Sequence, residues 1–299
     1  MPAGMATVAW RLRRKIRQLF LTAMNETALV TGCTSGIGLH LAREFAKHGH
    51  PLVLVAPDAL ELRALAVSLS TEFGVSATPV AKDLEDPEAA EDIFYRMERE
   101  GIVIDILVNN AGHGFHGKFW EIPIEKDLSM MRLNIEAVVR LTKFFLPPML
   151  ARREGRIFNT ASVAGFEPGP MLNVYHSTKA FVLSFSEALA IELEGTGVSV
   201  TALCPGATDT DFFTKAGMEG VVAFQKGNLM APQEVAEAGY KGAMDRELLV
   251  IPGVINKAMV GARRILTESA QAKINAKMYE EVPPEDRTRS RGDKEEAHR

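Results

Sequence analysis

Short apolar runs alternate with longer amphipathic stretches from about residue 27 to residue 252. The apolar runs predict strands over residues 28–30, 52–56, 76–81, 105–108, 156–161, 199–203 and 248–251. Between them, apolar residues recur at helical spacing, which predicts helices ending near residue 48, over 59–73, 86–99 and 124–146, and after residue 174. Strands that alternate with long helices are typical of parallel sheets with right-handed crossovers. We therefore predict the α/β fold class, with a single Rossmann-like doubly wound parallel sheet and helices on both faces.

Four segments flank or interrupt this pattern. Residues 1–24 place arginines and a lysine around an apolar stripe, which predicts a basic amphipathic helix. Such a helix either contacts an anionic membrane surface or docks on its own domain or a partner subunit. Within the predicted α/β domain, 25–252, a loop-and-helix stretch at about 207–229 predicts a lid. A helical extension follows over 253–282, with one helix from 254 to about 278, and a charged tail, 283–299, is predicted to be disordered.

Composition narrows the class of protein. The chain has 299 residues, 46% hydrophobic and 24% charged, which suits one α/β domain with extensions. A net charge of −4 gives no reason to expect nucleic acid as a partner. Cys33 and Cys204 lack the spacing of a metal site or a disulfide, so we predict no metal and a reducing compartment. No apolar run approaches the roughly 20 residues that span a bilayer. The expected location is cytoplasmic, possibly with membrane association through residues 1–24.

A glycine-rich turn joins the first predicted strand to its helix. Gly32, Gly36 and Gly38 have the spacing Gly-x3-Gly-x-Gly, which differs from the common Gly-x-Gly-x-x-Gly fingerprint. Glycines at such a turn let the backbone approach a phosphate, and the helix N-terminus favours its negative charge. The turn therefore predicts a phosphate site for a dinucleotide.

Polar residues follow the second, third and fourth predicted strands. Asp58 comes after the second strand, either as a ribose ligand or as a helix N-cap. Asp83 follows the third strand, and Asn109, Asn110 and the residues 111–112 follow the fourth. Open α/β sheets bind ligands at these strand ends, although Asn-Asn-Ala-Gly is also ordinary loop chemistry. These residues do not decide between NAD and NADP.

The chemistry centres on Tyr175 and Lys179, which lie four residues apart on a predicted helix and so share one face. A free tyrosine has a pKa of about 10, and a nearby ammonium is expected to lower it toward the range of a general acid/base. Ser162, from a separate strand end, would hydrogen-bond a substrate oxygen. Asn134 lies among apolar helical neighbours, which indicates a specific hydrogen-bonding task. Alternatively, Tyr175 and Lys179 merely share a surface helix.

The lid is rich in apolar residues, among them Phe212, Phe213, Met218 and Phe224. This composition favours a lipophilic substrate, and it equally suits packing of the lid onto its own domain.

The ordered set of Thr31-Gly-Cys-Thr-Ser-Gly-Ile-Gly38, Asp83, Asn109-Asn-Ala-Gly112, Asn134, Ser162, Tyr175-x3-Lys179 and Pro205-Gly206 resembles the short-chain dehydrogenase/reductase family over roughly residues 25–252. The resemblance implies that Tyr175 is the acid/base, that Lys179 lowers its pKa and binds the ribose, and that Ser162 binds the carbonyl. It also implies that Asn134 holds a water in a proton relay. The implied cofactor-binding residues are Gly32, Thr34, Ser35, Gly36, Ile37, Gly38, Asp58, Asp83, Leu84, Asn110, Ala111, Gly112, Tyr175, Lys179, Pro205, Gly206 and Thr208.

Three positions depart from the family's cofactor patterns. Pro57 stands where NADP-using relatives often carry arginine, and Ser35 adds no positive charge to the glycine turn. The acid expected for NAD is also missing, because Ala56 occupies its position. The cofactor is therefore expected to be NADP or NAD without a choice between them.

The predicted function is hydride transfer between a nicotinamide cofactor and a carbonyl or secondary alcohol. The lid and the extension resemble the branch of 3-oxoacyl reductases and hydroxysteroid dehydrogenases, which implies a lipophilic small-molecule substrate. The family resemblance also implies a homo-oligomer. The alternative is a catalytically silent NAD(P)-binding redox sensor or scaffold, which would not need the complete Asn-Ser-Tyr-Lys set.

Overall fold

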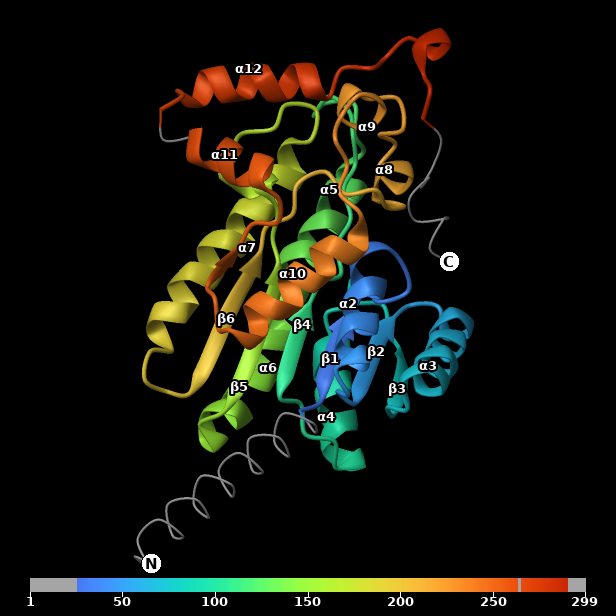
Figure 1. The fold of residues 1–299 in the computed structure, drawn as a ribbon, viewed down its shortest axis with the longest axis vertical. Helices are drawn as coiled ribbons and strands as arrows, with labels where there is room; N and C mark the ends of the chain where they lie inside the picture. Colours follow the sequence, from blue (N-terminus) through green and yellow to red (C-terminus); the bar gives the residue numbers. More distant parts are fainter. Residues whose placement is uncertain (1–25, 263–264, 290–299) are drawn as a thin grey trace, which may run out of the picture.

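The computed structural model describes residues 26–262 and 265–289, and within them a seven-stranded parallel sheet forms the centre of the molecule (Figure 1). The strands are β1 (Ala28–Thr31), β2 (Leu52–Ala56), β3 (Ala77–Ala81), β4 (Ile106–Asn109), β5 (Gly155–Thr160), β6 (Val198–Leu203) and β7 (Leu249–Val250). Their order is β3-β2-β1-β4-β5-β6-β7, so the winding reverses between β1 and β4. The predicted doubly wound sheet is confirmed. The crevice at such a reversal is where open α/β sheets bind ligands.

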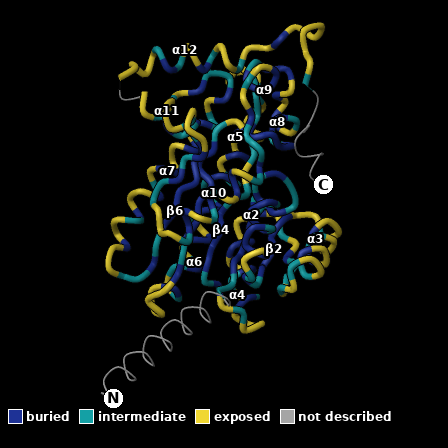
Figure 2. The backbone as a smooth tube through the Cα atoms, viewed as in Figure 1, coloured by how far each residue is buried: buried dark blue, intermediate teal, exposed yellow. Residues whose placement is uncertain are grey.

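Helices cover both faces of the sheet. They are α2 (Gly36–Lys47), α3 (Ala59–Phe73), α4 (Ala89–Glu100), α5 (Ile124–Met131), α6 (Ala137–Arg152), α7 (Asn173–Glu192), α8 (Phe212–Lys215), α9 (Val222–Gln225), α10 (Pro232–Met244), α11 (Val254–Ala262) and α12 (Glu268–Met278). Successive strand side chains point to opposite faces. Val30 accordingly packs in a cluster with residues of α2, α3 and α10, while Leu29 packs with residues of α4, α6 and α7. Figure 2 shows the strands mostly buried and the outer helices α3 and α12 largely exposed.

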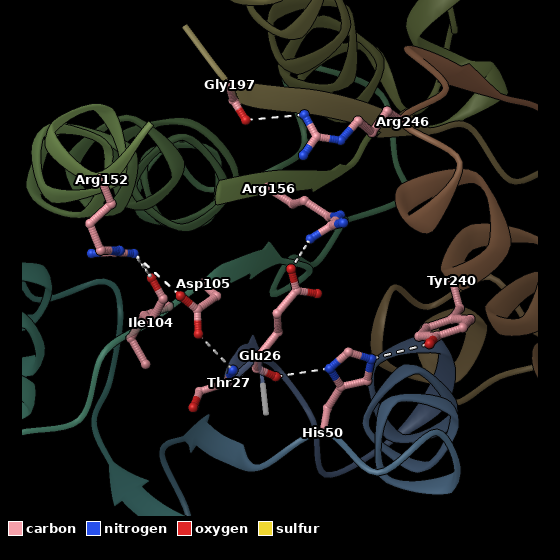
Figure 3. A network of polar contacts seen from close by, with 10 residues as sticks. All are labelled: Glu26, Thr27, His50, Ile104, Asp105, Arg152, Arg156, Gly197, Tyr240 and Arg246. Atoms are coloured by element: carbon pink, nitrogen blue, oxygen red, sulfur yellow. Dashed lines mark hydrogen bonds and ion pairs between the residues drawn. The ribbon is translucent and has the colours of Figure 1, made fainter. Parts of the chain in front are cut away.

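A network of polar contacts closes the amino ends of the strands (Figure 3). Glu26, just before β1, forms an ion pair with Arg156 of β5. His50 donates from Nδ1 to the Glu26 carbonyl at 2.8 Å and accepts at Nε2 from the Tyr240 hydroxyl of α10 at 3.1 Å. We call the contacts of Figure 3 the amino-end network. It joins the start of the sheet to helices that lie far away in the sequence.

The second half of the amino-end network centres on Asp105, which precedes β4. Its carboxylate accepts from the Thr27 backbone N–H at 3.0 Å and pairs with Arg152 of α6 at 3.4 Å. Arg152 also donates to the Ile104 carbonyl at 3.0 Å. The starts of β1 and β4 are thus fixed to each other and to α6.

The helix predicted over 124–146 is wrong as one continuous α-helix. α5 ends at Met131, a π-helical turn covers Arg132–Glu136, and α6 then runs to Arg152. The wider turn contains Asn134, whose side chain is held by three hydrogen bonds to residues outside the helix. π-helical turns occur frequently at functional sites.

The single helix predicted over 254–278 is also wrong. α11 ends at Ala262, and α12 begins after Thr267, whose hydroxyl caps it by accepting from the Ala270 N–H at 3.3 Å. Figure 1 shows α8, α9, α11 and α12 gathered at one end of the sheet.

The charged tail was predicted to be disordered from residue 283, and its first residues contradict this. Gln225 of α9 accepts from the backbone N–H groups of Thr288 and Arg289, each at 3.0 Å. Arg289 also stacks over the Phe224 ring. These contacts fix the segment up to residue 289 against the lid.

The predicted N-terminal helix and most of the predicted tail fall outside the residues that the structure describes. They are residues 1–24 and 290–299. Within the described part, no helix is long and apolar enough to cross a membrane.

Candidate active site

A cavity of about 800 Å³ lies at the carboxyl ends of the strands. Its lining comes from the turn between β1 and α2, from the ends of β2 to β6, from α7, from the lid and from α12. Every residue predicted to bind the cofactor lines this cavity, as do Ser162, Tyr175 and Lys179. The sheet therefore brings together residues that are up to 176 positions apart along the chain, from Gly32 to Thr208.

The glycine-rich turn forms one wall. Gly32 has a φ of +63°, which a residue with a side chain rarely adopts. A Cβ atom on Gly38 would lie 2.0 Å from the Gly32 carbonyl oxygen and 2.3 Å from Asn110 Nδ2, so only glycine fits there. The side chain of Ser35, the N-cap of α2, makes no capping hydrogen bond to the helix. This cradle fits a dinucleotide phosphate, because the backbone at a helix N-terminus favours negative charge.

Asn110, which follows β4, hydrogen-bonds to the ends of β1 and β5. Its Nδ2 donates to the Thr31 carbonyl at 3.0 Å, and its Oδ1 accepts from the Thr160 hydroxyl at 3.2 Å. The Thr31 hydroxyl in turn accepts from the backbone N–H groups of Asn110 and Ala111. The ends of β1, β4 and β5 are therefore held as one rigid rim.

Asp58 and Asp83 line the cavity at the ends of β2 and β3. Asp58 caps α3 by accepting from the Leu60 and Glu61 N–H groups at 2.8 and 2.9 Å, so the N-cap interpretation is confirmed. Asp83 accepts from the Glu85 N–H at 3.0 Å. Both carboxylates thus have backbone partners and still line the cavity.

Lys179 is buried and Tyr175 is half-buried on the inner face of α7. Lys179 is only 5% exposed and donates from Nζ to the Thr160 carbonyl at 2.8 Å, at the end of β5. Its Nζ lies 5.8 Å from the centre of the Tyr175 ring. Ser162, at the end of the same strand, accepts from the Ala164 N–H at 3.1 Å and lines the cavity. The interpretation of Tyr175 and Lys179 as a mere surface pair is wrong.

Burial governs the titration of this pair. It raises the pKa of Tyr175 to about 12, and a hydrogen bond with Ser162 works in the opposite direction. Burial also lowers the pKa of Lys179 to about 8. Burial dominates at Tyr175, because loss of water around the hydroxyl disfavours the phenolate. The lowering of the Tyr175 pKa by Lys179 stays a prediction.

Asn134 lies behind the cavity rather than in its lining. Its Oδ1 accepts from the His113 N–H at 3.1 Å, and its Nδ2 donates to the His113 carbonyl and to the Thr178 hydroxyl, both at 3.0 Å. Thr178 donates in turn to the Tyr175 carbonyl at 2.8 Å. The predicted hydrogen-bonding task is observed, and it connects the π-helical turn to the backbone of the tyrosine.

The apolar residues of the lid divide between packing within the lid and lining the cavity. Val221 and Phe224 are fully buried and pack inside the lid, whereas Phe212, Phe213 and Met218 line the cavity. Phe212 contacts the Tyr175 ring, with 5.1 Å between the ring centroids.

The extension contributes a residue that sequence reasoning missed. Tyr279, directly after α12, lines the cavity, and its hydroxyl donates to His176 Nε2 at 2.9 Å. His176 donates from Nδ1 to the Glu167 carbonyl at 2.7 Å. No sequence signal pairs two residues that lie 103 positions apart. Thr178 could have been found, because it lies within the Tyr-x3-Lys segment.

The described residues contain no group of three or more His, Cys, Asp or Glu side chains placed to hold a metal ion. Cys33 and Cys204 are both buried and unpaired by any disulfide.

Comparison with known proteins identifies the family. Residues 26–220 match the family model described as short chain dehydrogenase. A short chain dehydrogenase of Pseudocercospora fijiensis is 36% identical over 188 residues, which cover 62% of this chain and 60% of that protein. The very-long-chain 3-oxoacyl-CoA reductase of Anas platyrhynchos is 35% identical over 184 residues, covering 60% of this chain and 58% of the reductase. The chain thus spans less than two thirds of the length of these two curated relatives.

A solved structure extends the likeness to the fold. The short-chain dehydrogenase from Sphingobium yanoikuyae in complex with NADPH superposes with a TM-score of 0.72 at 37% identity. The match covers 80% of this chain and 94% of that one. Because the family model matches well over half of the sequence, this chain belongs to the short-chain dehydrogenase family.

Proposed function

We propose that this protein is an NAD(P)-dependent oxidoreductase that interconverts a carbonyl and a secondary alcohol. One observation carries the proposal: Tyr175, Lys179 and Ser162 face the same cavity as the glycine cradle at the N-terminus of α2. A dinucleotide whose phosphates bind at the cradle would extend across the strand ends, with its nicotinamide near Tyr175. Neither a sensor nor a scaffold needs an acid/base beside a buried lysine at that place.

The protein's own residues supply the proton and the positioning. A bound nicotinamide cofactor would supply the hydride to the carbonyl carbon. Tyr175, whose pKa of about 12 keeps it protonated at neutral pH, would donate its proton to the carbonyl oxygen as negative charge develops there. Ser162 would orient that oxygen beside the tyrosine. Lys179 would stabilise the remaining phenolate until it regains a proton.

The substrate is proposed to be lipophilic. The lining away from the glycine cradle is largely apolar and includes Phe212, Phe213, Met218, Met259 and Met278. Burial of apolar substrate surface there would contribute about 25 cal/mol per Å². The likeness to a very-long-chain 3-oxoacyl-CoA reductase supports the same class, so we propose a 3-oxoacyl or steroid-like carbonyl.

The test is turnover of NADH and NADPH against a panel of 3-oxoacyl thioesters and bulky cyclic ketones. Tyr175→Phe is expected to lower kcat by about 10²- to 10⁴-fold, the usual range for a general acid. Cofactor affinity should stay within about twofold of the wild type, because the phenyl ring remains. Tyr95→Phe, on the exposed part of α4, is the matched control. Full turnover in Tyr175→Phe would refute the mechanism, and cofactor binding without turnover on any carbonyl would favour the silent sensor.

A cytoplasmic location is part of the proposal, since two buried, unpaired cysteines suit a reducing compartment. Peripheral membrane contact through residues 1–24 is proposed from their basic amphipathic pattern. Co-sedimentation with anionic liposomes tests the second point. A truncated chain beginning at Asn25 should bind less, and equal binding would exclude the contact.

A homo-oligomer is proposed as well. Ile124, Leu128 and Met131 of α5 and Phe181 and Ile191 of α7 are large apolar side chains with substantial exposure. Their burial between copies would remove apolar surface from water. Sedimentation velocity measures the outcome, and a monomer at micromolar concentration would rule the proposal out.

A further inference from the structure

Lys215 reaches from the lid to the glycine cradle. It is the last residue of α8, and its Nζ donates to the Ser35 hydroxyl at 3.2 Å across 180 positions of sequence. Ser35 immediately precedes Gly36, the first residue of α2. Lys215 is exposed and lines the cavity, so its ammonium stands at the mouth of the proposed phosphate site.

The other lysines of the lining are already engaged. Lys82 forms an ion pair with Asp92, and Lys179 donates to the Thr160 carbonyl beside the tyrosine. Among the described residues, Lys215 forms no ion pair with a carboxylate, and its only side-chain partner is the neutral Ser35 hydroxyl. Its positive charge is therefore available to an anion.

The cavity lining carries more carboxylates than lysines, so a bound diphosphate would need a nearby positive charge. The carboxylates belong to Asp58, Glu61, Asp83, Glu85 and Glu167. A diphosphate entering this cavity would be repelled by them unless a cation lies close to it. The glycine cradle itself contributes only backbone groups and the Ser35 and Thr34 hydroxyls.

Backbone hydrogen bonds and a contact with Gly36 hold the lid next to the glycine cradle. The Met230 N–H donates to the Ala207 carbonyl and the Asp209 N–H donates to the Met230 carbonyl, both at 3.0 Å, which fixes the base of the lid. A Cβ atom on Gly36 would lie 3.2 Å from Thr210 Cβ, so the lid already contacts the cradle. Lys215 lies five residues after Thr210 on this anchored segment.

We propose that Lys215 binds the diphosphate of the dinucleotide from the lid side, exchanging the Ser35 hydroxyl for a phosphate oxygen. The inference rests on the proposed function, and it names a cofactor-binding residue that lies on the lid rather than on the sheet. The diphosphate is the partner, because it binds at the N-terminus of the first helix, next to Ser35. A 2′-phosphate would instead lie after β2, near Pro57 and Asp58. The contact also holds the lid closed whenever the cofactor is bound.

Calorimetric binding of NADH, NADPH, ADP and adenosine to the full chain tests the proposal. Lys215→Gln is expected to weaken NADH, NADPH and ADP about tenfold each and to leave adenosine unchanged, because adenosine carries no phosphate. The difference should shrink at high ionic strength, since an exposed ammonium is screened. Lys226→Gln is the matched control, because Lys226 lies on the same lid, is exposed and does not line the cavity.

Other results would overturn the inference. Equal affinities of wild type and Lys215→Gln for all four ligands would exclude the contact, and a loss confined to NADPH would move it to the 2′-phosphate. If the wild type binds neither NADH nor NADPH, the proposed function itself fails. Acetylation of the wild type adds a readout without substitution: NADH should protect Lys215 and not Lys226, and equal labelling of Lys215 with and without NADH would contradict the proposal.

Discussion

The two ends of the sheet carry similar polar groups and use them differently. At the amino ends, charges are paired with each other, as in Glu26 with Arg156 and Asp105 with Arg152. At the carboxyl ends, Lys179 has a carbonyl as its partner and Tyr175 faces a cavity of about 800 Å³. The carboxylates of the amino-end network are paired with its arginines, although Arg156 Nε is buried without a hydrogen-bond partner. The carboxyl end instead leaves Tyr175 and Ser162 directed at a cavity that a ligand can fill.

Shifted pKa values do not separate the two ends. Burial lowers the pKa of His50 and raises that of Tyr240 to about 12 in the amino-end network. Burial likewise raises the pKa of Tyr175 and lowers that of Lys179 at the carboxyl end. Perturbed titration indicates a functional site only in combination with a cleft. Here the cavity and the glycine cradle, not the shifts, mark the active end.

The comparison predicts that breaking the amino-end network costs stability and not chemistry. Arg156→Met leaves the Glu26 carboxylate, 12% exposed, without its partner. We expect the free energy of unfolding to fall by about 3 kcal/mol, as for other buried ion pairs that lose one member. Urea unfolding and turnover per folded molecule measure the two effects.

Arg140→Met is the matched control, because its ion pair with Glu136 is more than 40% exposed on both sides. Its expected cost is at most about 0.5 kcal/mol. Lower turnover per folded molecule in Arg156→Met would contradict the separation of the two ends.

At the carboxyl end, the titration of Lys179 should appear in the pH dependence of stability. Folding lowers the pKa of Lys179 from 10.5 to about 8, because burial disfavours the ammonium. Between these values the unfolded chain binds more protons than the folded chain, so the free energy of unfolding rises with pH. The contribution of Lys179 is complete above about 10.5 and is lost as the pH falls from there through about 8.

The difference between wild type and Lys179→Met isolates this contribution. We expect that difference to shift in favour of the wild type by about 2 kcal/mol from about pH 8 to about pH 10. Urea unfolding of both proteins at matched pH values measures it. A difference that does not change with pH would show that Lys179 keeps an ordinary pKa in the folded protein.

The sequence predicted the end of the sheet that carries the site, because strand ends and glycine spacing are local features. Asn134, Ser162, Tyr175 and Lys179 were named from their types and order. The titration of Tyr175 could not be predicted, since it depends on how completely the fold removes water from its hydroxyl.

Two other features also arise only from tertiary packing. The π-helical turn at Arg132–Glu136 reflects contacts of Asn134 with His113 and Thr178. The contacts of Tyr279 and Lys215 with the site join residues more than 100 positions apart, and no periodicity encodes them.

The smallest expected effect concerns Asp58, which has a capping role and faces the cofactor cavity. Asp58→Ala removes the two hydrogen bonds to the start of α3, so we expect a loss of about 1 kcal/mol in the free energy of unfolding. Asp58→Asn should retain the cap, because asparagine is an equally good N-cap residue. Thr267→Ala, which removes the cap of α12, is the matched control far from the cradle.

Calorimetry with NADH then separates the two roles of Asp58. If the carboxylate also binds the adenosine ribose, both Asp58 variants lose affinity, although only Asp58→Ala loses stability. If both variants bind NADH as the wild type does, Asp58 has only a structural role, like the paired charges at the amino ends of the strands. Structural polar residues would then occur inside the cavity as well, next to the ligand-binding cradle, and not only at the amino ends of the strands.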